Sequence, residues 1–248
     1  MTPLDQHQIE LRKNLLGWQN KPLLQQIYRG FYKKIIDLID PTAIGPTVEL
    51  GSGIGNLKIH LPNAIGTDLF PNPWLDLSCD AYELPFASGS VSHLVLFDVF
   101  HHLRAPKAFL NEARRVLTAN GRVILFEPFV SWSSRPVYSV FHHEPIGWRD
   151  KIDFSDRLER PRDYYAAQGN ATRLFFRRSK KMRDKLGDWK IFHAEAFASF
   201  AYLLSGGYSR PAFYPARLLP TLQGFDEKLS RWPKLFGARC LVGLQPPA

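Results

Sequence analysis

The stretch TVELGSGIGN (Thr47–Asn56) decides the fold of this chain. A short apolar run that carries one acid, Glu49, is followed at once by glycines at alternate positions, namely Gly51, Gly53 and Gly55. Glycine adopts left-handed backbone conformations that other residues avoid. The pattern therefore predicts a tight turn between a buried strand and a helix, with backbone N–H groups turned toward a ligand.

The spacing of the glycines argues against a phosphate ligand. A dinucleotide-binding turn needs glycines at its first, third and sixth positions, and the sixth position here is Asn56. No Gly-Lys-Ser/Thr follows, which excludes a P-loop. The carboxylate of Glu49 would also repel a pyrophosphate at close range. A cationic nucleoside without phosphate suits the turn better, and an ordinary strand-to-helix turn is the alternative.

Further strands follow the glycine turn, and they indicate a doubly wound α/β fold with a mixed seven-stranded sheet. Continuous apolar runs of this kind are typical of parallel strands covered on both faces. A third strand is only hinted at in residues 74–86, and the last two segments are expected to pair antiparallel. The predicted segments are Thr47–Leu50, Ala64–Leu69, Ser92–Phe97, Arg122–Pro128, Asp188–Ala196 and Gly237–Leu244.

Two amphipathic helices are expected on this sheet. Residues 106–121 have Pro106 at the start, apolar residues at helical spacing and Gly121 as a stop signal. Residues 21–39 have the same spacing, and we expect this helix to cover the ligand side of the sheet. It belongs to an N-terminal helical segment, residues 1–40.

The composition predicts a soluble, cytoplasmic protein. The 248 residues are 45% hydrophobic, which suffices for a core, and no run approaches the ~20 apolar residues of a membrane span. Two distant cysteines, Cys79 and Cys240, suggest neither a disulfide framework nor a metal knuckle and are expected to be buried. The net charge is +9, and residues 149–190 carry thirteen Lys and Arg residues against seven acidic ones. This basic segment is either a solvated face or a surface for anionic partners.

Five stretches in this order resemble the class I S-adenosylmethionine-dependent methyltransferases, in the broad group that includes ubiquinone and menaquinone methyltransferases. They are VELGSGIG, GTDL, DAYELPFASGSVSHLVLFDVFHHL, FLNEARRVLTANGR and VILFEP, which together cover about a third of the chain between Val48 and Pro128. The resemblance implies that residues 41–248 form the methyltransferase domain. It also implies S-adenosylmethionine as cofactor and S-adenosylhomocysteine as product. No metal is expected, for the reason given below for the histidines.

The resemblance assigns a role to each cofactor-binding position. Gly51, Gly53 and Gly55 would approach the methionyl and ribose parts, and Glu49 would lie near the amino group. Asp68, with Leu69 beside it, would accept hydrogen bonds from the ribose hydroxyls. Asp80 and Ala81 would flank the adenine, and Phe97 would lie beside the cofactor. Phe70 and Trp74 are weaker candidates, and the alternative for Asp80 is a turn residue.

Histidines are the candidates for removing a proton from the methyl acceptor, because their usual pKa lies near neutrality. His101 and His102 follow the fourth strand, and His142 and His143 precede Glu144 after the fifth. A structural turn is the alternative for the first pair and a polar loop for the second. A metal site at residues 142–144 is disfavoured, because adjacent histidines in a loop lack the helical spacing that aims two rings at one ion.

Residues 130–188 mix aromatic and basic residues and are expected to form a lid over the substrate side. Arg173, Arg177 and Arg178, interleaved with Phe175 and Phe176, would grip an anionic acceptor. The predicted function is methylation of a small or amphipathic anionic molecule, such as a lipid-linked, quinone-like, phenolic or sugar-containing one. The alternatives are a nucleic-acid methyltransferase and a non-catalytic S-adenosylmethionine-binding protein, and the lid could also contact a membrane surface.

Overall fold

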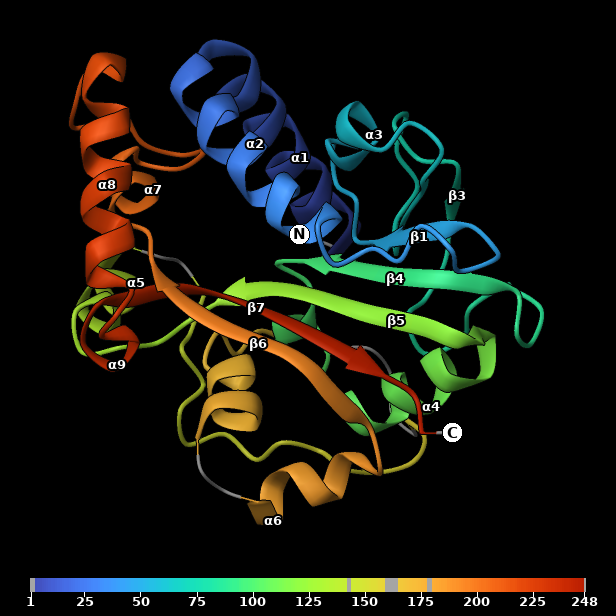
Figure 1. The fold of residues 1–248 in the computed structure, drawn as a ribbon. Helices are drawn as coiled ribbons and strands as arrows, with labels where there is room; N and C mark the ends of the chain where they lie inside the picture. Colours follow the sequence, from blue (N-terminus) through green and yellow to red (C-terminus); the bar gives the residue numbers. More distant parts are fainter. Residues whose placement is uncertain (1–2, 142–143, 159–164, 178–179, 248) are drawn as a thin grey trace.

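The computed structural model describes residues 3–141, 144–158, 165–177 and 180–247. Its centre is a seven-stranded sheet in the order β3-β2-β1-β4-β5-β7-β6 (Figure 1). The first five strands run parallel, and β7 is antiparallel to both of its neighbours. This confirms the predicted fold and the antiparallel last pair. The strands are β1 (Thr47–Leu50), β2 (Ile65–Asp68), β3 (Leu77–Ser78), β4 (Val91–Phe97), β5 (Leu117–Pro128), β6 (Lys190–Ala198) and β7 (Gly237–Gln245).

Helices cover both faces of the sheet. In Figure 1, α1, α2 and α3 lie above the strands, and α4 and α6 lie below them. Within the described residues no helix is both long and apolar enough to cross a bilayer. The helices are α1 (Pro3–Asn20), α2 (Pro22–Ile36), α3 (Leu57–His60), α4 (Pro106–Val116), α5 (Ser134–Phe141), α6 (Lys180–Arg183), α7 (Phe200–Leu204), α8 (Leu219–Leu229) and α9 (Pro233–Phe236).

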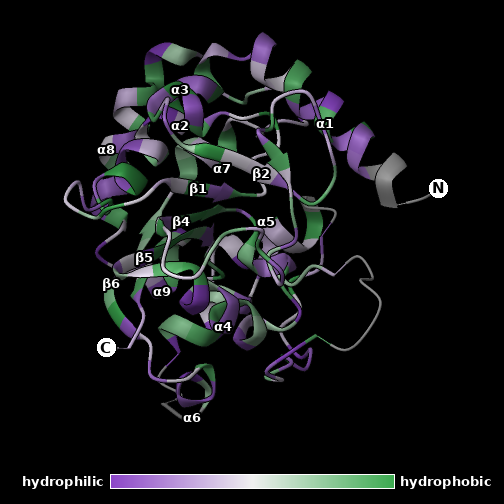
Figure 2. Ribbon diagram, turned by 90° about the vertical axis from the view of Figure 1, so that its right-hand side faces the viewer, coloured by the Kyte–Doolittle hydropathy of each residue, from purple (hydrophilic) through white to green (hydrophobic). Residues whose placement is uncertain are grey.

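The alternation of side chains along β4 divides the core into two layers. Leu94 and Leu96 pack toward the cluster that contains α4, whereas Val95 and Phe97 pack toward the cluster that contains α2. Every residue of β4 is buried, as expected for a central strand covered on both faces. Figure 2 shows hydrophobic residues along β4 between helices that carry both hydrophobic and hydrophilic residues.

One predicted boundary is wrong, because Gly121 does not end the helix that starts at Pro106. The helix α4 ends at Val116, and Leu117 already has an extended backbone and pairs with Val91 of β4. Leu117 is 5% exposed, so burial against the core favours the strand at this point over another helical turn. Gly121 lies within β5 instead.

The predicted lid is partly a core element. Phe175 is 5% exposed and its ring centroid lies 5.6 Å from that of Phe100. Phe176 packs edge-on against Phe129 at 5.2 Å. These two rings therefore stabilise the fold and do not face a substrate, contrary to the sequence-based expectation. Other residues of the segment, described below, do line a cavity.

Candidate functional site

A cleft of about 340 Å³ lies at the carboxyl ends of β1, β2 and β4. At this edge the chain turns one way from β1 to β2 and the other way to β4, and open α/β sheets bind ligands at such a switch point. Six of the residues predicted to bind the cofactor line it together. They are Gly51, Gly53, Asp68, Leu69, Asp80 and Ala81.

The three glycines of the turn all have left-handed backbones, with φ of 69° at Gly51, 53° at Gly53 and 74° at Gly55. A Cβ atom at Gly51 would lie 2.3 Å from Cγ2 of Val99, so no other residue fits there. A Cβ atom at Gly53 would meet only Leu11, at 3.9 Å. Gly53 is therefore constrained by its backbone conformation and by the space above it, which is where a ligand would lie.

Asp68 is held at the end of β2 by backbone donors. Its Oδ2 accepts from the N–H of Gly53 at 3.1 Å, and its Oδ1 accepts from the N–H of Leu69 at 2.7 Å. Each carboxylate oxygen has a second lone pair, so both can also accept from a pair of ribose hydroxyls. The link to Gly53 couples the position of the carboxylate to the glycine turn.

Asp80 combines the two roles considered for it. Its Oδ1 accepts from the N–H of Tyr82 at 2.7 Å, which makes a local side-chain turn. Asp80 and Ala81 nevertheless both line the cleft. The turn thus fixes the edge of the cleft at which the adenine was predicted to bind.

Glu49 lies under the turn and is 2% exposed. Its Oε2 has no hydrogen-bond partner among the residues that the structure describes. Burial raises the pKa of Glu49 to about 8; Ser52 lowers it by a hydrogen bond, and the nearby charge of Asp68 raises it. A cationic group arriving beside this carboxyl would favour its ionised form.

We expect cofactor binding at pH 7 to release most of one proton from Glu49, because a pKa of about 8 leaves the free carboxyl mainly protonated. The affinity for the cofactor should rise as the pH is raised from 4.5 toward 8, because between its usual and its raised pKa Glu49 is protonated in the free protein and must lose that proton when the cofactor binds. Glu49→Gln should abolish the release and weaken binding roughly tenfold or more. Calorimetry in two buffers of different ionisation enthalpy measures both effects. Exposed Glu83→Gln is the matched control, and an unchanged proton count in Glu49→Gln would contradict the assignment.

Three of the nine residues predicted to bind the cofactor do not line the cleft, namely Glu49, Gly55 and Phe97. Glu49 is buried under the turn, and the ring of Phe97 stacks on Tyr28 at 5.3 Å within the core under α2. The cover of the cleft comes from α1 and not from α2. The residues of α1 that line it are His7, Glu10, Leu11 and Asn14, which sequence reasoning missed.

Behind the cleft, the predicted histidine pair belongs to a buried polar cluster. His101 Nδ1 lies 2.6 Å from Glu127 Oε2, and His101 Nε2 lies 3.2 Å from Glu144 Oε2. His102 Nδ1 lies 2.9 Å from the carbonyl oxygen of Tyr165, and its Nε2 lies 3.4 Å from Glu144 Oε1. His102 lines the cleft, whereas His101 does not. His142 and His143 lie outside the described residues.

The two histidines have opposite electrostatic surroundings. Burial acts to lower the pKa of His101, but the charges and hydrogen bonds of Glu127 and Glu144 outweigh it and raise this pKa to about 10. His101 therefore keeps its proton near neutrality and is unsuited to act as a base. Burial and the charge of His101 lower the pKa of His102. A neutral imidazole at His102 has a lone pair for a proton or a ligand.

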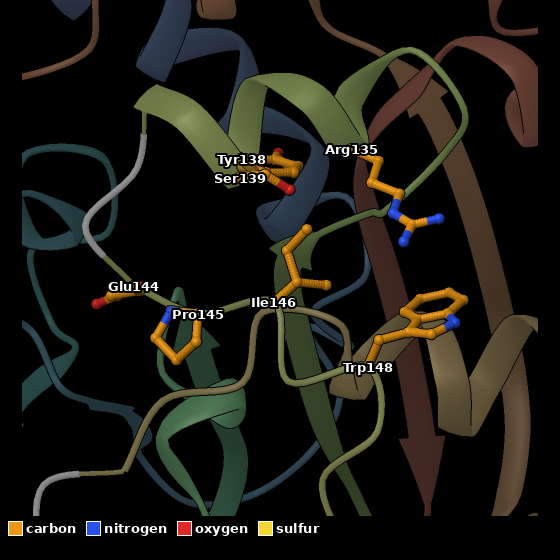
Figure 3. Close-up of a pocket in the computed structure, with 7 residues that line it drawn as sticks. All are labelled: Arg135, Tyr138, Ser139, Glu144, Pro145, Ile146 and Trp148. Atoms are coloured by element: carbon orange, nitrogen blue, oxygen red, sulfur yellow. The ribbon is translucent and has the colours of Figure 1, made fainter.

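A second cavity, the polar cavity, has a volume of about 440 Å³ and is lined in part by Glu144 (Figure 3). In Figure 3 Arg135 projects from α5 toward Trp148, and Glu144 lies at the opposite end of the cavity. Glu144 lies 3.4 Å from His102, so this contact connects the lining of the polar cavity with the lining of the cleft. The cavity is lined by Arg135, Tyr138, Ser139, Glu144, Pro145, Ile146 and Trp148.

The sequence of residues 48–125 matches the family model described as a methyltransferase domain. This match runs from β1 into β5 and includes the glycine turn, Asp68, Asp80 and the first histidine pair. No curated protein sequence matches the chain significantly.

Solved structures are similar to the chain over most of its length. A chain of the complex that contains the Trm112 methyltransferase activator of Haloferax volcanii is 18% identical, with a TM-score of 0.54 over 100% of this chain and 99% of that one. A methyltransferase from Thermotoga maritima is 13% identical, with a TM-score of 0.52 over 96% and 99%.

The geranyl diphosphate C-methyltransferase of Streptomyces coelicolor is 11% identical, with a TM-score of 0.51 over 89% and 81%. At these identities the structures show a shared fold, while the sequence match over residues 48–125 shows the kind of domain. Residues 48–125 of this chain therefore belong to a methyltransferase domain, and the whole chain has a fold that it shares with solved methyltransferases.

Proposed function

We propose that the protein transfers a methyl group from S-adenosylmethionine, bound in the cleft, to a small or amphipathic anionic acceptor, bound in the polar cavity beside Glu144. The observation that carries the proposal is the contact between His102, which lines the cleft, and Glu144, which lines the cavity. Methyl transfer is an in-line displacement that needs the reacting atoms about 3–3.5 Å apart, so the acceptor would reach past this pair of side chains into the cleft.

The walls of the cavity suit an anion that has an apolar part. Arg135 is exposed at its rim, and Trp148 and Ile146 supply apolar surface. The guanidinium of Arg177 stacks over Trp148, 3.9 Å from the ring centroid, and adds positive charge at the same rim. An arginine can bind a carboxylate or phosphate through two parallel hydrogen bonds.

The structure alters the predicted group of three arginines. Arg173 donates to the carbonyl oxygens of Gly147 at 2.9 Å and Asp150 at 2.8 Å, so it holds the loop that carries Trp148. Arg178 lies outside the described residues. We therefore assign the anion to Arg135 and Arg177, and we regard Arg173 as a structural residue.

The acceptor class can be tested with labelled S-adenosylmethionine and a cell extract of small molecules and lipids. We expect label to enter an anionic or amphipathic compound, and nuclease treatment of the extract should not reduce it. Loss of labelled product after nuclease treatment would instead support a nucleic-acid acceptor. Binding of S-adenosylmethionine without any transfer would support the non-catalytic alternative.

Once the acceptor is known, Arg135→Gln should raise its Michaelis constant about 10- to 100-fold, the effect of losing hydrogen bonds to a charged group. Cofactor affinity should not change, because Arg135 does not line the cleft. Exposed Arg217, which lines neither cavity, provides the matched control Arg217→Gln. Equal Michaelis constants in the two variants would exclude Arg135 from acceptor binding.

A further inference from the structure

Three side chains from distant parts of the sequence converge between the two cavities. His101 and His102 lie in the single turn after β4, and Glu144 lies in the segment after α5. Their ligand atoms all lie within 4.8 Å of one another. Two imidazole nitrogens and a carboxylate form a donor set that zinc and related divalent metals prefer in proteins.

The distances within this cluster suit a shared ion. The Nε2 atoms of His101 and His102 lie 3.2 Å and 3.4 Å from the two carboxylate oxygens of Glu144. Nitrogen and oxygen ligands lie about 2.0–2.2 Å from zinc, so neighbouring ligands around a tetrahedral ion are about 3.3–3.5 Å apart. An ion could bind here with only small movements of the side chains.

Each of the three side chains is also oriented by a further hydrogen bond. His101 Nδ1 pairs with Glu127, which in turn accepts from the N–H groups of Val99 and Phe100 at 2.9 and 2.7 Å. His102 Nδ1 pairs with the carbonyl oxygen of Tyr165. Metal-binding histidines usually use their second nitrogen in this way, which directs the first nitrogen at the ion.

The carboxylate is fixed in the same manner. The side-chain N–H of fully buried Gln168 donates to Glu144 Oε2 at 3.2 Å. Without an ion, the proton of His101 holds this side chain to Glu144, and a metal ion would take the place of that proton. Such outer hydrogen bonds are typical of ligands that hold a metal.

We propose that His101, His102 and Glu144 bind one divalent transition-metal ion, with zinc as the best match to the donor set. Three protein ligands leave a fourth position for water or for an oxygen of a second molecule. Glu144 lines the polar cavity and His102 lines the cleft, so this position lies where the cavities meet. Metal binding itself does not depend on the proposed acceptor, whereas a role of the ion in orienting an acceptor oxygen rests on the proposed function.

The test uses the full chain, freed of metal with a chelator and titrated with Zn²⁺ by calorimetry and with Co²⁺ by visible absorption. We expect one equivalent to bind, with the strong visible absorption of a four-coordinate cobalt site. His102→Ala and Glu144→Gln should each weaken binding at least 100-fold. Glu127→Gln, which leaves the three ligands in place, should weaken it about 10- to 100-fold.

His193→Ala is the matched control, because His193 lies on β6 and lines neither cavity. Thermal unfolding of each metal-free variant establishes that it is folded. Binding to His102→Ala and Glu144→Gln as tight as to the parent would overturn the proposal, and so would a parent that binds neither ion. Methyl transfer measured on the same metal-free samples separates this failure from a failure of the proposed function.

Discussion

Glu127→Ala is expected to lower the free energy of unfolding by about 3–5 kcal/mol, the usual cost of removing one partner of a buried charged pair. Glu127 is fully buried and accepts from the N–H groups of Val99 and Phe100 and from His101 Nδ1. Alanine would leave two backbone donors and Nδ1 of the charged His101 imidazole without an acceptor in the interior. Urea denaturation of the parent and the variant measures the difference.

Glu127→Gln separates the charge from the hydrogen bonds. Its amide oxygen can still accept from a backbone N–H, so we expect a smaller loss of stability than with alanine. Glu83→Ala removes an exposed carboxylate and should change the free energy of unfolding by less than about 0.5 kcal/mol. If Glu127→Ala were no less stable than Glu83→Ala, the cluster would not support the turn after β4.

His102→Ala is expected to lower the rate of methyl transfer about 10²- to 10⁴-fold, the usual contribution of a group that handles a proton in the transition state. His102 is the described histidine that lines the cleft and also contacts Glu144 of the polar cavity. Loss of a metal ligand at this position would also lower the rate of methyl transfer. The Co²⁺ titration shows whether His102 binds a metal ion or acts on a proton. Single-turnover measurements with saturating cofactor give the rate.

The control for this prediction is His193→Ala, which should transfer methyl groups at the parental rate. The affinity of His102→Ala for S-adenosylhomocysteine should stay within a few fold of the parent, since the predicted cofactor contacts lie on β1, β2 and the loop after β3. A variant that binds the cofactor and retains full activity would show that His102 has no part in the reaction.

The sequence was sufficient to predict most strands of the sheet and the residues that form one wall of the cleft. The glycine turn follows β1, Asp68 is the last residue of β2 and Asp80 lies two residues beyond β3; the ends of parallel strands meet at one edge of a sheet. The resemblance to the methyltransferase family therefore predicted one cleft for these residues, and the structure brings them together with Gly51, Gly53 and Ala81 beside them.

The rest of the site depends on contacts between distant segments. Glu144 meets His102 across 42 positions of the sequence, and His7 of α1 reaches the edge of Asp68, 3.9 Å away. No periodicity in the chain records either contact. The predicted helix end at Gly121 was wrong for a related reason. Glycine commonly ends helices, but here Leu117 pairs with β4, and this contact between distant segments ends the helix earlier.

The place of β7 in the sheet has a consequence for the order of folding during synthesis. Among the residues that the structure describes, β6 pairs with β7 alone, and β7 separates it from β5. As the chain leaves the ribosome, β1 to β5 can pair with one another, but β6 has no neighbour until β7 emerges. After β5 has paired with β4 and before β7 has emerged, the free edge of β5 exposes unpaired backbone groups, which other chains can bind. A nascent chain paused between residues 198 and 237 should therefore be the species most prone to aggregate and most dependent on a chaperone.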